Sequence, residues 1–418
     1  MTQLTATGPR LIAGWLDAKP LRNVFAAFDA AQAEVRVVGG AIRNTLIDRP
    51  VIDVDLATPA LPEAVIELAR RAGLGAHPTG IEHGTVTLVS EGVGFEVTTL
   101  RRDIETDGRH ATVAFTQSWD DDAQRRDFTI NALYCAPDGT IYDPMGGIAD
   151  LRRRRVRFIG DGEARIREDY LRILRFFRFS AEYGKGHLDA DGLAAAIKLK
   201  QGLSKLAAER VRSEFLKLLA APYAAEVVRT MHESGILALV LPGTLHPERL
   251  ARLQAIEAGL GQPPDVICGL AALAVSGPGD VDGLAQRLRL SNNEASALRS
   301  AASVDPGLDP AQPETAACAA LYRLGSEAFR RAVVVAWARS NASATEAAWR
   351  KRALLTDRWS PPKMPFSGSD VLALGIPAGP AVGEILRAFE AWWIAAAFPA
   401  DRALQLEKFE AFATNEVH

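Results

Sequence analysis

Cysteine is scarce in this sequence, and its three cysteines, Cys135, Cys268 and Cys318, lie far apart. They form neither a disulfide framework nor a zinc-binding pattern, which suits a reducing compartment. The seven histidines are scattered as well, without the close spacing of a histidine metal site. These absences argue against a disulfide-stapled secreted domain and against a zinc centre.

Long apolar runs and a strong net charge are also missing. No run approaches the ~18 apolar residues of a membrane span, and the N-terminus lacks the basic-then-apolar pattern of a secretion signal. The net charge is only −3 at pH 7, so binding to an anionic polymer would require a local basic patch. We therefore expect a soluble, cytoplasmic protein without a membrane partner. Its 418 residues, 48% of them hydrophobic, can bury several cores.

A glycine pair stands between a predicted strand and a predicted helix near the N-terminus. A β-branched run over residues 35–38 ends in Gly39 and Gly40, and the helix-compatible sequence AIRNTLI follows. Glycines at the mouth of a helix let backbone N–H groups approach a phosphate without a Cβ in the way. Arg43, one turn into this helix, can reach the same phosphates. Alone, such a glycine pair is usually no more than a turn.

Two aspartates follow on what we predict to be a second apolar strand. Asp53 and Asp55 are two residues apart, and the period of a strand puts their side chains on the same face. Like charges at that distance repel each other, and Mg²⁺ relieves the repulsion, since it takes one or two carboxylates together with phosphate oxygens. An isolated Asp-x-Asp is usually a solvated strand end. Together with the glycine pair, it indicates metal-dependent nucleotidyl transfer.

The next segments predict one helix and three strands. The helix spans Glu63 to Ala72, and the strands lie at Gly75–Thr79, Thr85–Ser90 and Phe95–Leu100. On the last of these, Glu96 is either a third carboxylate beside the aspartate pair or an ordinary glutamate of an edge strand, and the pattern favours neither. Residues 101–110 carry both charge signs without apolar period, which predicts a mobile loop.

A basic pair follows an acidic run in the segment DDDAQRRDFTINALY. We predict that Arg125, Arg126 and Asp127 open a helix, preceded by an acid-rich cap at residues 120–122. The two arginines either bind a triphosphate or neutralise the acids before them, and spacing alone does not decide between these alternatives.

Beyond Asp143 the sequence is almost entirely helical in pattern. Residues 152–178 hold ten arginines and four acids, a net charge of +6. Within them Asp169, Arg172, Arg175 and Arg178 recur every three residues and should form one stripe on a helix. The stripe is either a solvated basic face or, because it starts with Asp-x-x-Arg, a set of hydrogen-bonding groups for a base edge. Further on, Glu209 and Arg210 are expected to form structural ion pairs.

Taken together, these motifs resemble the class II CCA-adding tRNA nucleotidyltransferases and their close relatives, the bacterial poly(A) polymerases. The resemblance is strong over residues 35–220 and weaker in the helical remainder, where it returns in GSDVLALGIPAGPAVGEIL. The matching segments, in order, are GGAIR, DVD, EVTTLRRD, DGRHATVAF, RRDFTINAL, DPMGGIADL, EDYLRILRFFRF and AERVRSE. One departure is Asn44, where the family usually has aspartate; it affects local bracing more than chemistry.

The resemblance implies an α+β fold with a polymerase β-like nucleotidyltransferase head, built on a mixed sheet, and an all-helical neck, body and tail. The implied domains are residues 1–147, 148–235, 236–350 and 351–418. The resemblance implies Asp53 and Asp55 as catalytic residues that hold Mg²⁺, and we add Glu96 as the candidate third catalytic carboxylate. The implied nucleotide-binding residues are Gly39, Gly40, Arg43, Arg126, Asp127, Asp169, Arg172, Arg175 and Arg178.

The implied reaction adds C, C and A to the 3′ end of tRNA from CTP and ATP. In the family, a charged loop such as residues 101–110 is associated with the switch from C to A addition. Three alternatives stay open: a poly(A) polymerase, a CC-only or A-only enzyme, and an RNA-binding module with an inactive head. The intact pair Asp53 and Asp55 argues against the last.

Overall fold

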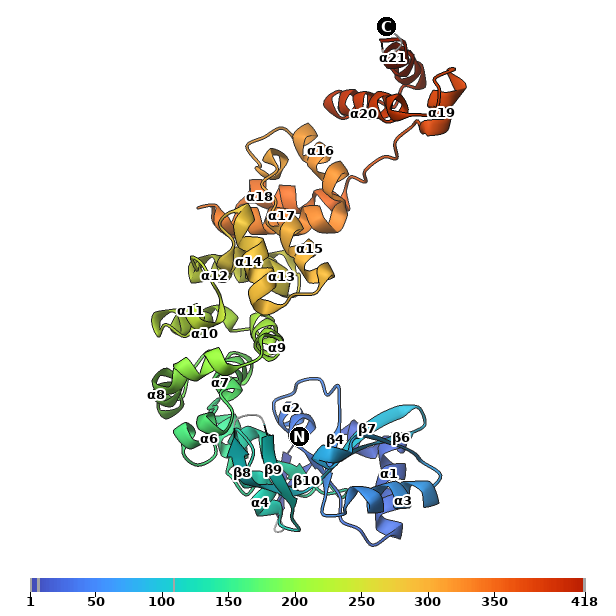
Figure 1. The fold of residues 1–418 in the computed structure, drawn as a ribbon. Helices are drawn as coiled ribbons and strands as arrows, with labels where there is room; N and C mark the ends of the chain where they lie inside the picture. Colours follow the sequence, from blue (N-terminus) through green and yellow to red (C-terminus); the bar gives the residue numbers. More distant parts are fainter. Residues whose placement is uncertain (1, 6–7, 108–109, 416–418) are drawn as a thin grey trace. The chain divides into compact units, whose positions relative to one another are not determined.

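The computed structural model describes residues 2–5, 8–107 and 110–415 of the chain. It divides into two compact units, residues 1–240 and residues 241–418. The strands that the structure describes all belong to the first unit, in the blue and teal part of Figure 1. Every site residue predicted above lies in that unit too. The finer division into four domains stays a prediction.

A seven-stranded mixed sheet forms the framework of the first unit. Its neighbouring strands β4 and β7 run parallel, and the other pairs run antiparallel. In spatial order the strands are β11 (Ile141–Tyr142), β10 (Tyr134–Cys135), β3 (Arg36–Val38), β4 (Asp55–Thr58), β7 (Val93–Thr99), β6 (Thr85–Ser90) and β5 (Gly75–Gly80). Along β6 every second residue is buried, as expected for a strand with one face on the core. The predicted mixed sheet is confirmed.

Helices cover both faces of this sheet. Helices α1 (Lys19–Ala30) and α3 (Pro62–Arg71) bury their apolar stripes with β6 and β7 in one core, and α4 (Trp119–Gln124) packs with Tyr134 in a second core. The short helix α2 (Gly40–Leu46) follows β3 directly. Before α5 the unit also contains two ribbons and some short 3-10 helices: β1 (Thr2–Thr5) with β2 (Gly8–Leu11), β8 (Arg101–Asp107) with β9 (His110–Phe115), η1 (Gly14–Asp17), η2 (Ile81–His83) and η3 (Thr129–Asn131).

The rest of the first unit is helical. Helix α7 is its centre, because its apolar residues pack against α9 and α10 and its phenylalanines meet Phe128 and Phe158. The elements are α5 (Gly147–Arg152), α6 (Gly162–Glu168), α7 (Leu171–Tyr183), α8 (Ala190–Leu199), η4 (Lys200–Lys205), α9 (Ala208–Leu219), α10 (Ala224–Glu233) and α11 (Leu237–Val240). This packing fixes α7 against the head.

The second unit is built from helices. Helices α12, α13 and α17 pack on one another, and a separate aromatic core surrounds Phe366, Phe389 and Trp393. The elements are α12 (Pro247–Leu260), α13 (Val266–Ala274), α14 (Pro278–Leu288), α15 (Asn292–Ala301), η5 (Pro306–Leu308), α16 (Glu314–Leu324), α17 (Ser326–Arg339), α18 (Ala347–Ala353), η6 (Leu354–Asp357), α19 (Gly368–Ala373), α20 (Pro380–Ala395) and α21 (Arg402–Asn415). Among the described residues, no helix is long and apolar enough to cross a membrane.

Two predictions about where elements begin were wrong. Asp53 is not on a strand: β4 begins at Asp55, because its partner β3 ends at Val38 and leaves the residues before Asp55 without a ladder. Arg125 and Arg126 do not open a helix. They follow α4, whose first turn holds the three acids 120–122, where negative charge is favourable at a helix N-terminus.

The prediction of a mobile loop at residues 101–110 was also wrong for the residues that the structure describes. Residues 101–107 form β8, which pairs with β9 from Arg101 opposite Phe115 to Asp107 opposite His110. Residues 108 and 109 lie outside the described part of the chain. The prediction considered only the charged segment, residues 101–107. The following segment, HATVAF, has the β-branched and aromatic composition of a strand.

Candidate active site

The aspartate pair lies at the start of strand β4, beside a glutamate of the neighbouring strand. The parallel register sets Leu56 opposite Val97, so that Asp55 and Glu96 are adjacent one residue earlier on each strand. The pKa of Asp55 is raised, first because surrounding atoms shield it from water and then because Glu96 and Asp53 carry like charge. A divalent cation would relieve this repulsion. The described residues contain no ready group of three His, Cys, Asp or Glu ligands, so a cation here would rely on carboxylates together with substrate oxygens.

The glycine turn brings backbone close to the neighbouring loop. Gly39 has φ +70°, a left-handed conformation that favours glycine, and a Cβ there would lie 3.4 Å from the carbonyl oxygen of Asn131. Its N–H donates to the carbonyl of Leu133 at 2.9 Å. The turn therefore needs glycine at position 39 and leads straight into α2.

Arg43 is clamped rather than free. Its guanidinium donates to the side-chain oxygen of Asn131 and to the hydroxyl of Tyr183 at 2.9 Å, and it lies over the Tyr183 ring at 4.1 Å. Its buried Nε has no hydrogen-bond partner among the described residues. Burial lowers the pKa of Arg43. Asn44 supports the same clamp, since it donates to the carbonyl of Pro50 and accepts from Tyr183 at 3.3 Å.

The basic pair after α4 is held by one acid of the preceding run. Asp122 binds Arg125 at 2.7 Å and Arg126 at 2.9 Å, and it also accepts from the hydroxyl of Tyr134 at 2.7 Å. Burial alone would raise the pKa of Asp122, but Arg126 and Arg125 outweigh it and hold that pKa at about 2. The two alternatives read from the sequence are therefore compatible: the arginines neutralise an acid, and both also line the cavity described next.

One cavity of about 450 Å³ gathers most of the predicted nucleotide-binding residues. This volume falls in the range of small-molecule sites, about 300–1,000 Å³. Its wall is made of Val38, Gly39, Gly40, Arg43, Asp55, Arg125, Arg126, Asp127, Asn131, Asp169, Arg172, Arg175 and Phe179. Of the predicted site residues, Asp53, Glu96 and Arg178 do not line it. A larger cavity of about 850 Å³ beside α1 and α3 contains no predicted site residue and is lined mostly by alanines and other small side chains.

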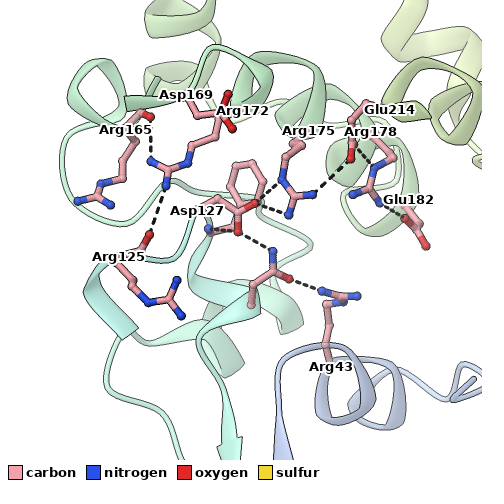
Figure 2. A network of polar contacts seen from close by, with 12 residues as sticks. Arg43, Arg125, Asp127, Arg165, Asp169, Arg172, Arg175, Arg178, Glu182 and Glu214 are labelled. Carbon is pink, nitrogen blue, oxygen red and sulfur yellow. Dashed lines mark hydrogen bonds and ion pairs between the residues drawn. The ribbon is translucent and has the colours of Figure 1, made fainter. Parts of the chain in front are cut away.

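The arginines of α7 are held by polar contacts, shown in Figure 2, and two of them, Arg175 and Arg178, share the carboxylate of Glu214. Arg175 binds Asp127 at 2.7 Å and Glu214 at 3.3 Å, while Arg178 binds Glu214 at 2.6 Å. Burial would raise the pKa of Asp127, but Arg175 outweighs it and holds that pKa below its ordinary value. Arg172 donates to the carbonyl oxygens of Arg165 at 2.8 Å and Arg125 at 3.3 Å. Several of these arginines are thus oriented by neighbours at the cavity instead of forming a solvated face.

The prediction that Asp169 and Arg172 lie on one helix was wrong for Asp169. Asp169 lies before α7, with extended backbone, and accepts from the N–H of Leu171 at 3.1 Å and from Arg210 of α9 at 2.7 Å. Arg172 instead pairs with Glu168. Asp169 and Arg172 still line the same cavity, but each is held by a different partner.

Sequence reasoning missed four residues of this network: Arg210, Glu214, Asn131 and Asp122. Arg210 and Glu214 come from α9, which the sequence places far from α7, and no local pattern indicates that the two helices pack together. Asn131 follows Asp127 by four residues and donates to it at 2.8 Å, a spacing that could have drawn notice. Asp122 could not be singled out from three consecutive acids.

The chain matches known families and proteins over most of its length. Residues 35–157 match the family described as "Poly A polymerase head domain", and residues 187–246 match "Probable RNA and SrmB- binding site of polymerase A". CCA tRNA nucleotidyltransferase 1, mitochondrial, of Danio rerio is 34% identical, over 88% of this chain and 84% of that protein. The CCA-adding enzyme of Geobacillus thermodenitrificans is 42% identical over 50% of this chain and 51% of that protein.

A solved structure is similar across nearly the whole chain. The CCA-adding enzyme of Bacillus stearothermophilus in complex with CTP superimposes with a TM-score of 0.74, covering 96% of this chain and 99% of that one at 26% identity.

Proposed function

The chain belongs to the family of CCA-adding tRNA nucleotidyltransferases and related poly(A) polymerases, and from this premise we propose that it adds C, C and A to the 3′ end of tRNA. The substrates are CTP, ATP and a tRNA that lacks its CCA end. The observation that carries the proposal is the 450 Å³ cavity, because the glycine turn, Asp55 and two arginines of α7, Arg172 and Arg175, line one space.

In the proposed arrangement the triphosphate lies between the glycine turn and the basic residues of the cavity. Gly39 and Gly40 admit the phosphates, and Arg43 and Arg126 supply positive charge. The 3′-oxygen of the RNA forms a bond to the α-phosphorus, and pyrophosphate leaves with the electron pair of the broken bond. Most of the rate in such chemistry comes from positioning and electrostatic stabilisation, which these fixed arginines provide.

Asp53 and Asp55 would hold Mg²⁺, with Glu96 as the neighbouring carboxylate. The like charges around Asp55 fit a divalent cation. When bound, the metal would lower the pKa of the attacking hydroxyl and stabilise the departing pyrophosphate. The family uses divalent metal, and the choice of Mg²⁺ is our proposal from the hard oxygen donors of the pair.

Asp169 and Arg172 would read the base of the incoming nucleotide. Cytosine and adenine both present an amino donor beside a ring-nitrogen acceptor, which matches a carboxylate acceptor beside a guanidinium donor. Uracil and guanine present the opposite order and would leave both groups unpaired. Arg210 holds Asp169, and the carbonyls of two neighbouring residues hold Arg172, so both groups are oriented before the base arrives. Arg175 and Arg178 would support them through Asp127 and Glu214.

The decisive experiment separates this activity from its alternatives. The full chain is incubated with tRNA lacking CCA and with CTP, ATP or both, and product lengths are read on a sequencing gel. We expect two C residues with CTP alone and completion by one A with both. Addition of C residues without A, or of A only to tRNA that already ends in CC, would indicate the partial enzymes. Long A tracts on generic RNA would indicate a poly(A) polymerase, the function named for the matching head family.

Two further points stay predictions. We propose that the β8–β9 hairpin takes part in the change from C to A addition, as a gating step rather than a bond-making one. We also expect the protein in the cytoplasm, although the Danio rerio relative is named as mitochondrial.

A further inference from the structure

Asp122 differs from the two acids beside it in what it contacts. Its side chain is 1% exposed and binds two arginines and a tyrosine hydroxyl. Asp120, two residues earlier, is exposed and accepts from the hydroxyl of Tyr142 at 2.8 Å. Asp121 accepts from the hydroxyl of Thr116 at 3.0 Å. Three identical acids in the sequence thus have three different partners, and only Asp122 joins the cavity arginines.

The Asp122 carboxylate divides its two oxygens between the two arginines. Oδ1 accepts from Arg125 Nε at 2.8 Å, and Oδ2 accepts from Arg126 Nη2 at 2.9 Å. Tyr134 adds a third contact, because its hydroxyl donates to Oδ2 and accepts from Arg126 Nε at 3.2 Å. Two guanidinium groups side by side repel each other, and a shared carboxylate is what keeps them together.

This arrangement leaves one end of each guanidinium for a ligand. Within the described part of the chain, the Nη1 atoms of Arg125 and Arg126 make no hydrogen bond, and both residues line the cavity. Asp122 also accepts from the backbone N–H of Arg101, at the start of β8, which lies 3.4 Å from Oδ1. Three elements therefore meet at one carboxylate next to the nucleotide cavity.

We propose that Asp122 is a positioning residue for triphosphate binding. It holds Arg125 and Arg126 side by side on the cavity wall, so that the open end of each guanidinium meets the phosphates of the incoming nucleotide. This inference rests on the proposed function, because it requires that the cavity binds a nucleoside triphosphate. It adds Arg125 to the phosphate contacts and gives the acidic run a role in the reaction.

The test compares Asp122→Asn with Asp120→Asn in the full chain. Both substitutions remove one negative charge from the first turn of α4 and one carboxylate beside a tyrosine hydroxyl, but only the first disturbs the arginines. We expect Asp122→Asn to raise the KM for CTP and for ATP by about tenfold or more, since small displacements of positioning groups cost up to about a hundredfold. The inhibition constant of inorganic triphosphate should rise by the same factor. Exclusion of UTP should not change, and Asp120→Asn should stay within about twofold of wild type.

The outcomes separate the inference from its premise. A wild-type chain that neither incorporates nor binds CTP contradicts the proposed function. If the wild type is active and Asp122→Asn is only less stable, with unchanged KM values and unchanged inhibition by triphosphate, the positioning role alone is overturned. An equal rise of the KM values in Asp120→Asn would overturn it as well. If Asp122→Asn does not fold, Tyr134→Phe replaces it, because it removes the hydroxyl that joins Asp122 to Arg126. It should raise both KM values a few-fold, and unchanged values would overturn the inference.

Discussion

The second unit should lose stability as the pH rises from about 4.5 to about 7, because of one buried carboxyl. Glu257 on α12 is 4% exposed, and within the described residues its carboxyl accepts one hydrogen bond, from the backbone N–H of Asp265 at 3.0 Å. Burial raises the pKa of the Glu257 carboxyl from an ordinary 4.5 to about 7. The folded chain thus keeps a proton that the unfolded chain has already lost.

The sign and size of the effect follow from this difference. Between pH 4.5 and about 7 the folded state binds one proton more than the unfolded state, so the free energy of unfolding falls as pH rises. Each pH unit in this window costs about 1.4 kcal/mol, which gives a loss of about 3 kcal/mol across it. The contribution of Glu257 is fully present below pH 4.5 and lost above about pH 7.

Glu257→Gln tests this directly. The amide keeps an oxygen for the Asp265 N–H but carries no charge, so at pH 8 the variant should be more stable than wild type by about 3 kcal/mol, or by roughly 5–10 °C in Tm. The advantage should vanish near pH 4.5. The assay is calorimetry of the full chain from about pH 4 to about pH 8, following the transition of the second unit.

The matched control is Glu327→Gln, an exposed carboxylate on α17 that pairs with Arg331 at 2.8 Å. It should change stability by less than about 1 kcal/mol, as exposed ion pairs do. Parallel curves for wild type and Glu257→Gln across this pH range would refute the reasoning.

Three further outcomes are expected. Asp53→Asn and Asp55→Asn should each abolish nucleotide incorporation while leaving Tm close to wild type, since each removes one carboxylate from the metal pair; near wild-type turnover in either variant would contradict the assignment. Arg172→Ala should admit UTP and GTP in misincorporation assays, since a good bidentate base contact contributes roughly 1–3 kcal/mol of selectivity, and continued full exclusion would remove Arg172 from base reading. Affinity for tRNA, measured by filter binding, should fall steeply as salt rises, because arginines release counterions from RNA phosphates, and a constant affinity would assign them to the protein interior.

The sequence by itself determined the parts of the site that are local along the chain. The glycine turn joins β3 to α2 within one short segment, and the glycine that its left-handed backbone favours is visible in the sequence at position 39. Asp55 and the run Arg125–Asp127 were found in the same way, because each motif is carried by one short segment. The strand-like run at residues 85–90 also predicted β6, in which every second residue is buried.

Only the tertiary structure decided which partner each charged group has. Arg210 and Glu214 reach the site because α9 packs on α7, and nothing in either helix specifies that contact in advance. Glu96 comes beside Asp55 through the parallel register of β4 and β7, a pairing between segments some forty residues apart. Periodicity tells which face of a helix or strand is buried, but a charged side chain takes its partner from whatever element packs against it. For that reason most of the charged cavity residues could be named from the sequence, whereas the network that holds them could not.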